Sequence, residues 1–422
     1  MTFYQKLRGT RDYLPPESET FRLVEEKVVE VINLYGYREI ITPLLERKEL
    51  FIRSVGETTD IVEKEMFTFR DKGGREVALR PEGTAPAVRA YLEGKIHKKE
   101  KFSRFFYRGS FFRYERPQAG REREFHQIGV EAIGEGSPHL DAEIISLGDT
   151  ILKTFNLKDY TLELGSVGCV EDRKKFILRI KENLETKKET LCEDCMRRLK
   201  KNPLRIFDCK REKCMEVARE LPSLLESLCD RCSEHLNRVR NLLENLRISY
   251  HLHPHLVRGI DYYTSTTFEF QHNLLGAQKT ILAGGRYDNL VEELGGISLP
   301  ACGFALGVER LILALNKEEK LPSSFKKMDI FVCYISEREF DYSFLLLENL
   351  RKEGLRGEMD LSGKNLKKQL KKASDLGVKF SLIVGEEEMK KGTVMVKDME
   401  KGVQEEVTRE EIVSFLKRRL GK

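Results

Sequence analysis

The feature that most constrains the fold of this chain is a pair of strand-like runs at residues 102–114 and 125–133. Both runs are rich in Phe, Tyr, Val and Ile, which favour strands, and a polar stretch at residues 115–124 joins them. Six arginines between residues 104 and 123 are interleaved with aromatic residues. The pattern predicts a long antiparallel hairpin with a flexible, basic loop.

Composition divides the rest of the chain. Residues 171–245 are rich in Lys, Glu and Leu and contain six of the nine cysteines, which indicates an inserted, mostly helical domain. A polar stretch at residues 317–327 precedes residues 328–422, where strand-like and helical patterns alternate as in a small α/β domain. The remaining residues, 1–170 and 246–325, then form the core that contains the hairpin.

Apolar content is ample for folded cores, because 40% of the residues are hydrophobic although 34% are charged. No run of about 18 apolar residues occurs, and the N-terminus lacks the apolar segment of a signal peptide. We therefore expect a soluble, cytoplasmic protein with no membrane contact. Its cysteines should be reduced, so close cysteine pairs favour metal binding over disulfides.

A net charge of +5 is too dilute to indicate a nucleic-acid partner by itself. One predicted helix, however, places lysines at the spacing that puts side chains on a single face. Its lysines are Lys364, Lys367, Lys368, Lys371 and Lys372. This face fits a polyanion such as RNA, and a merely solvated helix face is the alternative.

The two commonest phosphate-binding loops, Gly-x-x-x-x-Gly-Lys and Gly-x-Gly-x-x-Gly, are absent from the sequence. Any nucleotide would then be held by other groups, and arginine suits this role because its planar guanidinium matches phosphate oxygens. Arg113 lies on a predicted strand, and Arg310 follows the glycine-flanked strand at residues 303–307, where a helix begins. A helix start adds attraction for phosphate.

These residues together resemble a class II aminoacyl-tRNA synthetase, and specifically the histidyl-tRNA synthetase family. The class motifs are similar to Leu34-Tyr35-Gly36-Tyr37 through Ile41-Thr42-Pro43, to Phe112-Arg113-Tyr114-Glu115-Arg116-Pro117-Gln118 with Phe125-His126-Gln127, and to Gly303-Phe304-Ala305-Leu306-Gly307-Val308-Glu309-Arg310. Two signatures special to histidyl enzymes resemble Leu79-Arg80-Pro81-Glu82-Gly83-Thr84 and Leu256-Val257-Arg258-Gly259-Ile260-Asp261-Tyr262-Tyr263. The resemblance implies a class II antiparallel sheet core at residues 1–170 and 246–325, a helical insertion, and an anticodon-binding α/β domain at residues 328–422.

The resemblance also implies roles for individual residues. Arg258 and Arg113 would be the catalytic residues, on opposite sides of the α-phosphate. The residues implied for histidine binding are Glu82, Gly83, Thr84, Gln127, Glu131, Tyr262 and Tyr263. Those implied for ATP binding are Arg113, Glu115, Phe125, Gly284, Gly285 and Arg310. The side-chain chemistry agrees, because free histidine needs an anion for its ammonium group and partners for both ring nitrogens.

The implied reaction is ATP-dependent activation of L-histidine to histidyl-adenylate, followed by transfer to the 3′ end of tRNA-His. Mg²⁺ would bridge the outer phosphates of ATP, and catalysis would rest on positioning and charge stabilisation. The residues implied for tRNA binding are Arg116, Gln118, Arg121 and Arg123 in the hairpin loop and Lys364, Lys367, Lys368 and Lys371 in the C-terminal domain. The resemblance in the first motif implies a homodimer.

Two other functions stay open at this point. One is a catalytically silent regulatory subunit of ATP phosphoribosyltransferase in histidine biosynthesis, but such relatives typically lack the anticodon domain and the arginine equivalent to Arg258, and this chain keeps both. The other is a pure RNA-binding module. Arg113, Arg258 and Arg310 beside a histidine-like pocket argue against it.

Six cysteines of the insertion fall into three close pairs, 192/195, 209/214 and 229/232. Cys-x₂-Cys pairs are the usual geometry of tetrahedral zinc sites, so one structural zinc ion is a natural hypothesis. The first-choice ligands are Cys192, Cys195, Cys229 and Cys232, with Cys209 and Cys214 as core residues or substitute ligands. The alternative is that these cysteines are small buried hydrophobic residues, as expected for Cys169, Cys302 and Cys333.

Overall fold

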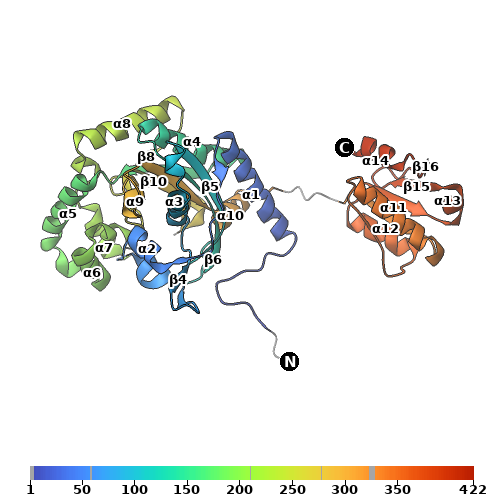
Figure 1. The fold of residues 1–422 in the computed structure, drawn as a ribbon, viewed down its shortest axis with the longest axis horizontal. Coiled ribbons are helices and arrows are strands. Elements are labelled where there is room, and N and C mark those ends of the chain that lie inside the picture. The colour runs from blue at the N-terminus through green and yellow to red at the C-terminus, as the bar shows by residue number, and fades with distance from the viewer. Residues whose placement is uncertain (1–3, 58, 210, 277, 323–327) are drawn as a thin grey trace. The chain divides into compact units, whose positions relative to one another are not determined.

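The protein is described by a computed structural model that covers every residue except 1–3, 58, 210, 277 and 323–327. The chain divides into two compact units, Met1–Pro322 and Ser323–Lys422, which are visible as separate bodies in Figure 1. Each unit is built around its own sheet.

The larger unit is organised by an eight-stranded sheet in the order β1-β5-β6-β11-β10-β9-β7-β8. The two outermost pairs, β1 with β5 and β7 with β8, are parallel, and all the other neighbours are antiparallel. The strands are β1 (Arg38–Glu39), β5 (Ser103–Phe112), β6 (Glu124–Ile133), β7 (Tyr160–Ser166), β8 (His251–Leu252), β9 (Thr264–His272), β10 (Thr280–Arg286) and β11 (Ala301–Gly307).

The predicted hairpin is confirmed. Strands β5 and β6 pair along their whole length, from Ser103 opposite Ile133 to Phe112 opposite Glu124. Strand β6 also pairs with β11, and β5 pairs with the short β1, so the hairpin lies inside the sheet. The long register fixes where the loop at residues 113–123 leaves the sheet.

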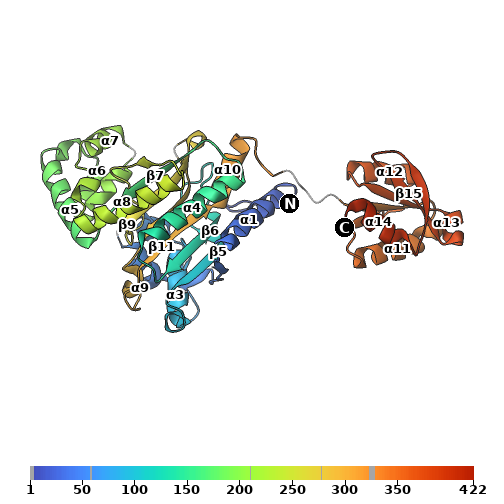
Figure 2. The same cartoon turned by 90° about the horizontal axis from the view of Figure 1, so that it is seen from above.

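One face of this sheet is covered by four helices that share a hydrophobic core with it. Figure 2 shows α1, α4 and α8 lying along this face. In α1, the apolar residues Phe21, Val24, Val28, Val31 and Ile32 form the buried stripe, and Gly36 ends the helix at a positive φ of 76°. The four helices are α1 (Glu17–Leu34), α4 (Pro138–Thr154), α8 (Asp230–Asn245) and α10 (Val308–Lys317).

Smaller elements complete the site-bearing part of this unit. A three-stranded sheet, in the order β2-β4-β3, precedes the helix α3 in the chain. The strands are β2 (Leu45–Arg47), β3 (Thr68–Arg70) and β4 (Glu76–Leu79), and the helices are α2 (Lys48–Val55), α3 (Thr84–Glu93) and α9 (Leu290–Glu293). A single π-helical turn, η1 (Ile61–Glu65), lies between α2 and β3.

The predicted insertion is helical in the structure. It contains α5 (Val170–Glu185), α6 (Glu193–Lys201), the short turn η4 (Pro203–Asp208), α7 (Glu212–Arg219) and α8. Helices α5, α6 and α7 contribute to a second hydrophobic cluster with Tyr262 and Tyr263, whereas α8 packs on α4 in the main core. The insertion is therefore joined to the sheet-bearing part by buried contacts at more than one place.

The smaller unit is a three-layer α/β structure. Its sheet has the order β13-β12-β14-β15-β16, with the first three strands parallel and the last three antiparallel. Helices α11 and α14 share a core with one face, and α12 packs on the other. The elements are β12 (Ile330–Tyr334), α11 (Phe340–Lys352), β13 (Gly357–Met359), α12 (Leu366–Asp375), β14 (Phe380–Val384), α13 (Glu386–Lys391), β15 (Thr393–Asp398), β16 (Gln404–Thr408) and α14 (Ile412–Leu420).

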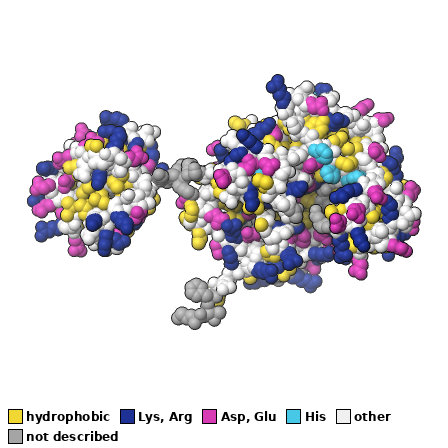
Figure 3. Space-filling view, turned by 180° about the vertical axis from the view of Figure 1, so that it is seen from behind, with side chains coloured by type: hydrophobic (Ala, Val, Ile, Leu, Met, Phe, Trp, Pro, Cys, Tyr) yellow, Lys and Arg dark blue, Asp and Glu magenta, His cyan; other side chains and the backbone are white. Residues whose placement is uncertain are grey.

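The surface is mixed in charge. In the face drawn in Figure 3, Lys and Arg side chains alternate with Asp and Glu side chains, in keeping with the small net charge. None of the helices in the described part of the chain has the length and apolar character needed to span a bilayer.

Candidate active site

A large cavity lies over the centre of the eight-stranded sheet, with an empty volume of about 1070 Å³ that includes its part open to solvent. Its walls come from the hairpin loop, from β6, β10 and β11, and from the loop that precedes β9. The cavity brings together many of the residues singled out from the sequence: Glu82, Thr84, Arg113, Glu115, Arg121, Phe125, Gln127, Arg258, Tyr262, Tyr263 and Arg310.

Four arginines from three segments converge on this cavity: Arg113 and Arg121 from the hairpin loop, Arg258 from the loop before β9, and Arg310 from α10. Burial, followed by the positive charges of Arg113 and Arg121, lowers the pKa of Arg310 to about 10. Burial also lowers the pKa of Arg113 and of Arg121. Cations that destabilise one another in a part-buried space favour the binding of an anion there.

Arg113 is held in place by neutral groups. Its Nε donates to the carbonyl oxygen of Pro81 at 2.9 Å, and its guanidinium lies 5.3 Å from the centre of the Phe125 ring. Its ion-pair contact with Glu115 is long, with 3.9 Å between Arg113 Nη1 and Glu115 Oε1. The guanidinium is oriented by the backbone and an aromatic face, so its charge remains available to a ligand.

Arg258 is held differently, by an ion pair with Glu269 on β9. The carboxylate of Glu269 also accepts hydrogen bonds from Thr280 Oγ1 at 2.7 Å and from Gln271 Nε2 at 3.0 Å. Burial lowers the pKa of Arg258, but Glu269 and Tyr263 raise it by more, so the net shift is upward. Arg258 therefore carries a secure positive charge at the cavity wall.

Arg310 is fastened by two carbonyl oxygens, that of Gly120 at 3.2 Å from Nε and that of Thr280 at 2.9 Å from Nη1. Gly120 belongs to the hairpin loop, which turns back on itself through hydrogen bonds between the backbones of Gln118 and Arg121. The start of α10 thus meets the loop tip at the cavity, a contact that sequence motifs alone do not reveal.

Another part of the cavity wall, close to Arg113, carries acidic and hydroxyl groups. The Glu82 carboxylate accepts hydrogen bonds from the backbone N–H groups of Thr84 and Ala85, at 2.7 and 3.0 Å, at the first turn of α3. Burial raises the pKa of Glu82, although these hydrogen bonds act in the other direction. A carboxylate in this position suits the ammonium group of an amino acid.

Glu131 lies behind this wall, and it is not among the residues that line the cavity. Its carboxylate accepts hydrogen bonds from Thr84 Oγ1 at 2.7 Å and from the hydroxyl of Tyr287. Burial raises the pKa of Glu131 to about 8. Tyr287, which lines the cavity, was missed by the sequence interpretation, although it lies in the Gly284-Gly285-Arg286-Tyr287-Asp288 run.

Two glycines make room for the ring of Tyr107 below this part of the cavity. A Cβ atom added to Gly83 would lie 2.2 Å from the Tyr107 ring, and one added to Gly129 would lie 2.3 Å from it. Tyr107 is itself buried, with 2% of its surface exposed. Gly83, implied by resemblance for histidine binding, thus has a packing reason to be glycine.

Gly284 and Gly285, implied for ATP binding, do not line the cavity. A Cβ at Gly284 would lie 2.1 Å from the carbonyl oxygen of Gly303 on β11. Gly285 has a φ of 155°, and a Cβ there would lie 2.4 Å from the carbonyl oxygen of Thr266 on β9. In this structure both glycines serve the close approach of neighbouring strands.

The residues expected to bind tRNA through the hairpin loop differ in their surroundings. Arg116 and Gln118 are exposed, as a docking role requires. Arg121 faces the cavity and pairs with Glu115, and the guanidinium of Arg123 lies 3.8 Å from the centre of the Tyr114 ring. The loop therefore presents two free polar side chains outward and directs one arginine inward.

In the smaller unit, four of the five clustered lysines are exposed, whereas Lys372 is half-buried and pairs with Glu358. Helix α12 begins at Leu366 with Asn365 as its N-cap, so Lys364 precedes the helix and approaches Asp360 at 3.7 Å. Lys367, Lys368 and Lys371 lie within α12, whose buried residues are Gln369 and Ala373. We define the exposed set Lys364, Lys367, Lys368 and Lys371 as the lysine face.

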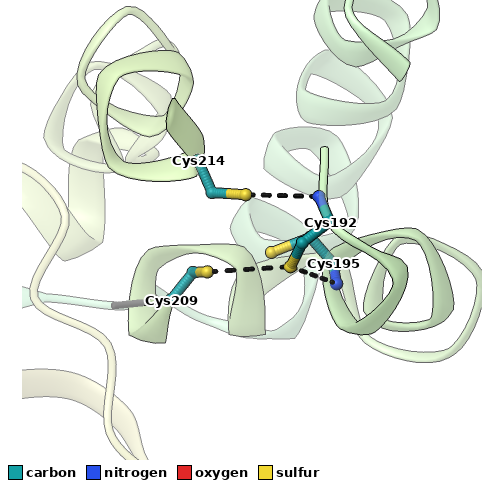
Figure 4. A group of neighbouring side chains, drawn as sticks. All are labelled: Cys192, Cys195, Cys209 and Cys214. Carbon is teal, nitrogen blue, oxygen red and sulfur yellow. Dashed lines mark hydrogen bonds between the residues drawn. The ribbon is translucent and has the colours of Figure 1, made fainter. Parts of the chain in front are cut away.

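The first-choice zinc ligands are wrong as a set. Cys192 and Cys195 lie beside Cys209 and Cys214 (Figure 4), whereas Cys229 and Cys232 lie beside Cys169 and Asp172. The reason is that Cys192 and Cys195 begin α6, while Cys229 caps α8, which packs in another part of the unit. Cys169 is therefore part of a cluster, against expectation, while Cys302 and Cys333 are buried core residues as predicted.

Comparison with known proteins agrees with this architecture. The family model of histidyl-tRNA synthetase matches residues 9–311, and that of an anticodon binding domain matches residues 329–419. The histidine–tRNA ligase of Halothermothrix orenii is 48% identical over 405 residues, covering 95% of this chain and 96% of its own. That of Aquifex aeolicus is 46% identical over 408 residues, covering 97% and 99%.

Among solved structures, apo histidyl-tRNA synthetase of S. aureus matches with a TM-score of 0.84 and 34% identity, covering 98% of this chain and 100% of its own. The fold, with its large, mostly antiparallel sheet, is that of a class II aminoacyl-tRNA synthetase. Within that class, the chain belongs to the histidyl-tRNA synthetase family.

Proposed function

We propose that this chain activates L-histidine with ATP to histidyl-adenylate and then transfers the histidyl group to the 3′ end of tRNA-His. The observation that carries this function is the cavity that combines four arginines with a carboxylate-bearing wall, in a chain 48% identical to a histidine–tRNA ligase. Phosphates and an amino acid have the complementary charges for these two sets of groups.

In the proposed reaction, the histidine carboxylate attacks the α-phosphorus and the bond to the β-phosphate oxygen breaks. Arg113 and Arg258 face the α-phosphate and stabilise the charge that develops on its oxygens in the transition state. Phe125 stacks on adenine, and Arg310 holds the γ-phosphate end. Each guanidinium is fixed before substrate arrives, by Pro81 or by Glu269 for example, so little reorganisation is needed.

For the amino acid, we propose that Glu82, Thr84 and Gln127 bind the α-ammonium group, while Tyr262 and Tyr263 contact the imidazole. Glu131 would act from behind Thr84 and Tyr287, because its carboxylate orients both hydroxyls. Glu82 lines the cavity from the segment just before α3, and Gln127 lines it from β6.

Mg²⁺ would enter with ATP. Glu115 and Glu309 line the cavity beside the arginines, which fits an ion that proteins usually hold through one or two carboxylates and substrate phosphates. When bound, the ion neutralises charge on the outer phosphates. The other expected metal, a structural zinc ion, would not contact the substrates, because among the described residues that line the cavity none is a cysteine.

For tRNA, we propose that Arg116 and Gln118 at the loop tip contact the acceptor end, with Arg121 and Arg123 supporting the loop. The lysine face would contact RNA phosphates from the smaller unit, which matches an anticodon binding domain. We further propose residues 1–170 and 246–325 as the catalytic core, residues 171–245 as the insertion, and residues 328–422 as the anticodon-binding domain.

A homodimer and a cytoplasmic location complete the proposal. The first motif and the two residues after it expose apolar side chains: Leu34, Ile41, Leu44 and Leu45, at 81%, 87%, 44% and 49% of their surface. Apolar side chains gathered in one short segment are typical of a surface that another chain covers.

The test is histidine-dependent exchange of pyrophosphate into ATP, measured without tRNA. We expect exchange with histidine and none with other amino acids. A chain that binds histidine but catalyses no exchange would instead be a silent regulatory relative, the alternative that Arg258 and the C-terminal unit disfavour. A chain that binds RNA but not histidine would be an RNA-binding module.

A further inference from the structure

Four cysteine thiols converge inside the insertion, outside the cavity described above. The Sγ atoms of Cys192, Cys195, Cys209 and Cys214 all lie within 4.8 Å of one another, and those of Cys192 and Cys209 are 4.0 Å apart. Figure 4 shows the four side chains pointing toward a common centre from three helical segments. A Zn–S bond of about 2.3 Å in a tetrahedron requires sulfurs about 3.8 Å apart, close to this arrangement.

The surroundings of the thiols favour bound metal over simple packing. Cys195, Cys209 and Cys214 are buried, and Cys192 is half-buried. The backbone N–H of Cys192 donates to the sulfur of Cys214 at 3.3 Å, and that of Cys195 donates to the sulfur of Cys192 at 3.5 Å. Packing alone would bury the side chains without turning all four sulfurs together, and N–H groups directed at sulfur stabilise thiolates.

The segment between the second and third cysteines reaches the loop that carries Arg258. Arg205 Nη2 donates to the carbonyl oxygen of Gly259 at 2.7 Å, directly after Arg258. Asn202 Nδ2 donates to Asp261 Oδ1 at 3.1 Å. Arg205 thus holds the backbone of Gly259, and Asn202 holds the side chain of Asp261, and both of these residues closely follow Arg258.

The same segment also braces a second wall of the cavity. Arg198 pairs with Asp60 at 3.3 Å, and Lys201 pairs with Glu63 at 3.0 Å. Asp60 and Glu63 belong to the turn around η1, in which Ile61 lines the cavity and the carbonyl oxygen of Glu65 accepts a hydrogen bond from the N–H of Tyr114. A displacement of residues 196–208 would therefore disturb two walls at once.

We propose that Cys192, Cys195, Cys209 and Cys214 bind one Zn²⁺ ion, and that this ion holds residues 196–208 against the loop after Arg258. The ion fixes both ends of that segment, and the segment positions the catalytic arginine through Arg205 and Asn202. The metal site itself is independent of the reaction, whereas its role in positioning Arg258 rests on the proposed function.

The other cluster, Cys169, Asp172, Cys229 and Cys232, supplies a matched control. Asp172 already accepts hydrogen bonds from the N–H groups of Cys169 and Cys229, at 3.2 and 3.0 Å. This carboxylate has a structural role at the starts of α5 and α8, so the convergence of this cluster has an explanation without metal.

The metal test uses the full chain purified without chelator, with zinc measured by elemental analysis. We expect C209S/C214S to hold one zinc fewer per chain than the unaltered protein, while C229S/C232S keeps that zinc. Cobalt substitution should give sulfur-to-metal charge-transfer absorption that C209S/C214S lacks. The site is refuted if the unaltered chain holds under about 0.2 zinc, if C209S/C214S retains it, or if both variants lose it equally.

The coupling test compares the zinc-loaded chain with the same chain stripped of zinc and then reloaded. We expect kcat for histidine-dependent exchange to fall tenfold to a hundredfold on stripping, with a smaller change in KM, because a displacement of about 1 Å in a catalytic group can cost this much. Reloading should restore it. R205A should reduce kcat while retaining zinc, and R205K should recover part of the loss.

Failure of each part can be told apart. Unchanged kcat after zinc removal would overturn the coupling and leave the metal site standing. Absence of exchange in the zinc-loaded, unaltered chain would refute the proposed function, while zinc content would still decide the metal site.

Discussion

The cavity and the lysine face both gather positive charge, but they hold it in opposite ways. In the cavity, the side chains of Arg113 and Arg258 are only 21% and 19% exposed and are fixed by Pro81 and Glu269. On the lysine face, Lys364 is 51% exposed, and its three companions are exposed as well. Fixed, part-buried charge acts on particular atoms, whereas exposed charge attracts a polyanion without defined geometry.

The largest effect that would test this contrast is expected at Arg258. We predict that R258A reduces histidine-dependent exchange by a factor on the order of 10²–10³, because the fixed guanidinium stabilises charge that grows in the transition state. The steady-state exchange rate at saturating ATP and histidine is the measurement.

R104A is the matched control, since Arg104 pairs with Glu143 away from the cavity. It should leave exchange nearly unchanged. An R258A variant that folds, as judged by circular dichroism, and exchanges at a near-normal rate would remove Arg258 from the catalytic residues.

A smaller effect is expected on the lysine face. Replacing Lys364, Lys367, Lys368 and Lys371 with Gln should raise KM for tRNA roughly tenfold, because each lost phosphate contact weakens RNA binding. Exchange without tRNA should stay unchanged, since the substitutions lie in the smaller unit. The salt dependence of tRNA binding should also become less steep, by about one unit of slope per contact.

Replacement of four exposed lysines of the larger unit with Gln provides a control with the same charge change: Lys72, Lys98, Lys99 and Lys174. If that variant weakened tRNA binding as much as the lysine-face variant does, the effect would be one of net charge. The anticodon-binding role of the lysine face would then be wrong.

A further effect concerns Glu131, a buried carboxylate behind the cavity wall. The pKa of Glu131 is raised from its ordinary 4.5 to about 8 by burial, so between these pH values the unfolded chain loses a proton that the folded chain keeps. The stabilising contribution is complete below pH 4.5 and is lost as pH rises toward 8. E131Q has no such ionisation.

Thermal unfolding of the ligand-free chain at pH 5.5 and pH 8.5 measures this difference. We predict that the melting temperature of the unaltered chain falls by several degrees more than that of E131Q over this range, because about 2.5 pH units below the folded pKa correspond to about 3 kcal/mol. E143Q, at a surface ion pair, should behave like the unaltered chain. Equal pH dependence in all three would show that Glu131 is ionised when folded.

Local patterns in the sequence predicted the fold where one short stretch contains the whole signal. The hairpin β5–β6 follows from two strand-like runs on either side of a polar stretch. Helix α3 was missed, because Thr84 through Val88 are all buried and show no polar face. Periodicity cannot reveal a helix that is covered on every side.

The residues of the candidate site also fall into two groups, those that sequence motifs reveal and those that only the tertiary structure reveals. Arg113, Arg258 and Arg310 lie in motifs and meet in the cavity as expected. Glu269, which fixes Arg258, has no such signal, because an acidic residue on a strand reads as surface until the tertiary contact is known. Which cysteine pairs lie together likewise depends on how α6, α7 and α8 pack, and the spacing of the cysteines in the sequence does not reveal this packing.

The packing of Tyr107 between Gly83 and Gly129 limits how these three positions can change during evolution. A Cβ at either glycine would overlap the ring, and a smaller residue at position 107 would leave a void beneath the acidic part of the cavity wall. Neither glycine can change alone without a clash, and Tyr107 cannot shrink alone without a loss of stability. The three positions therefore form one mutational unit, and drift toward another amino-acid substrate through this floor would require at least two coordinated changes in the same lineage.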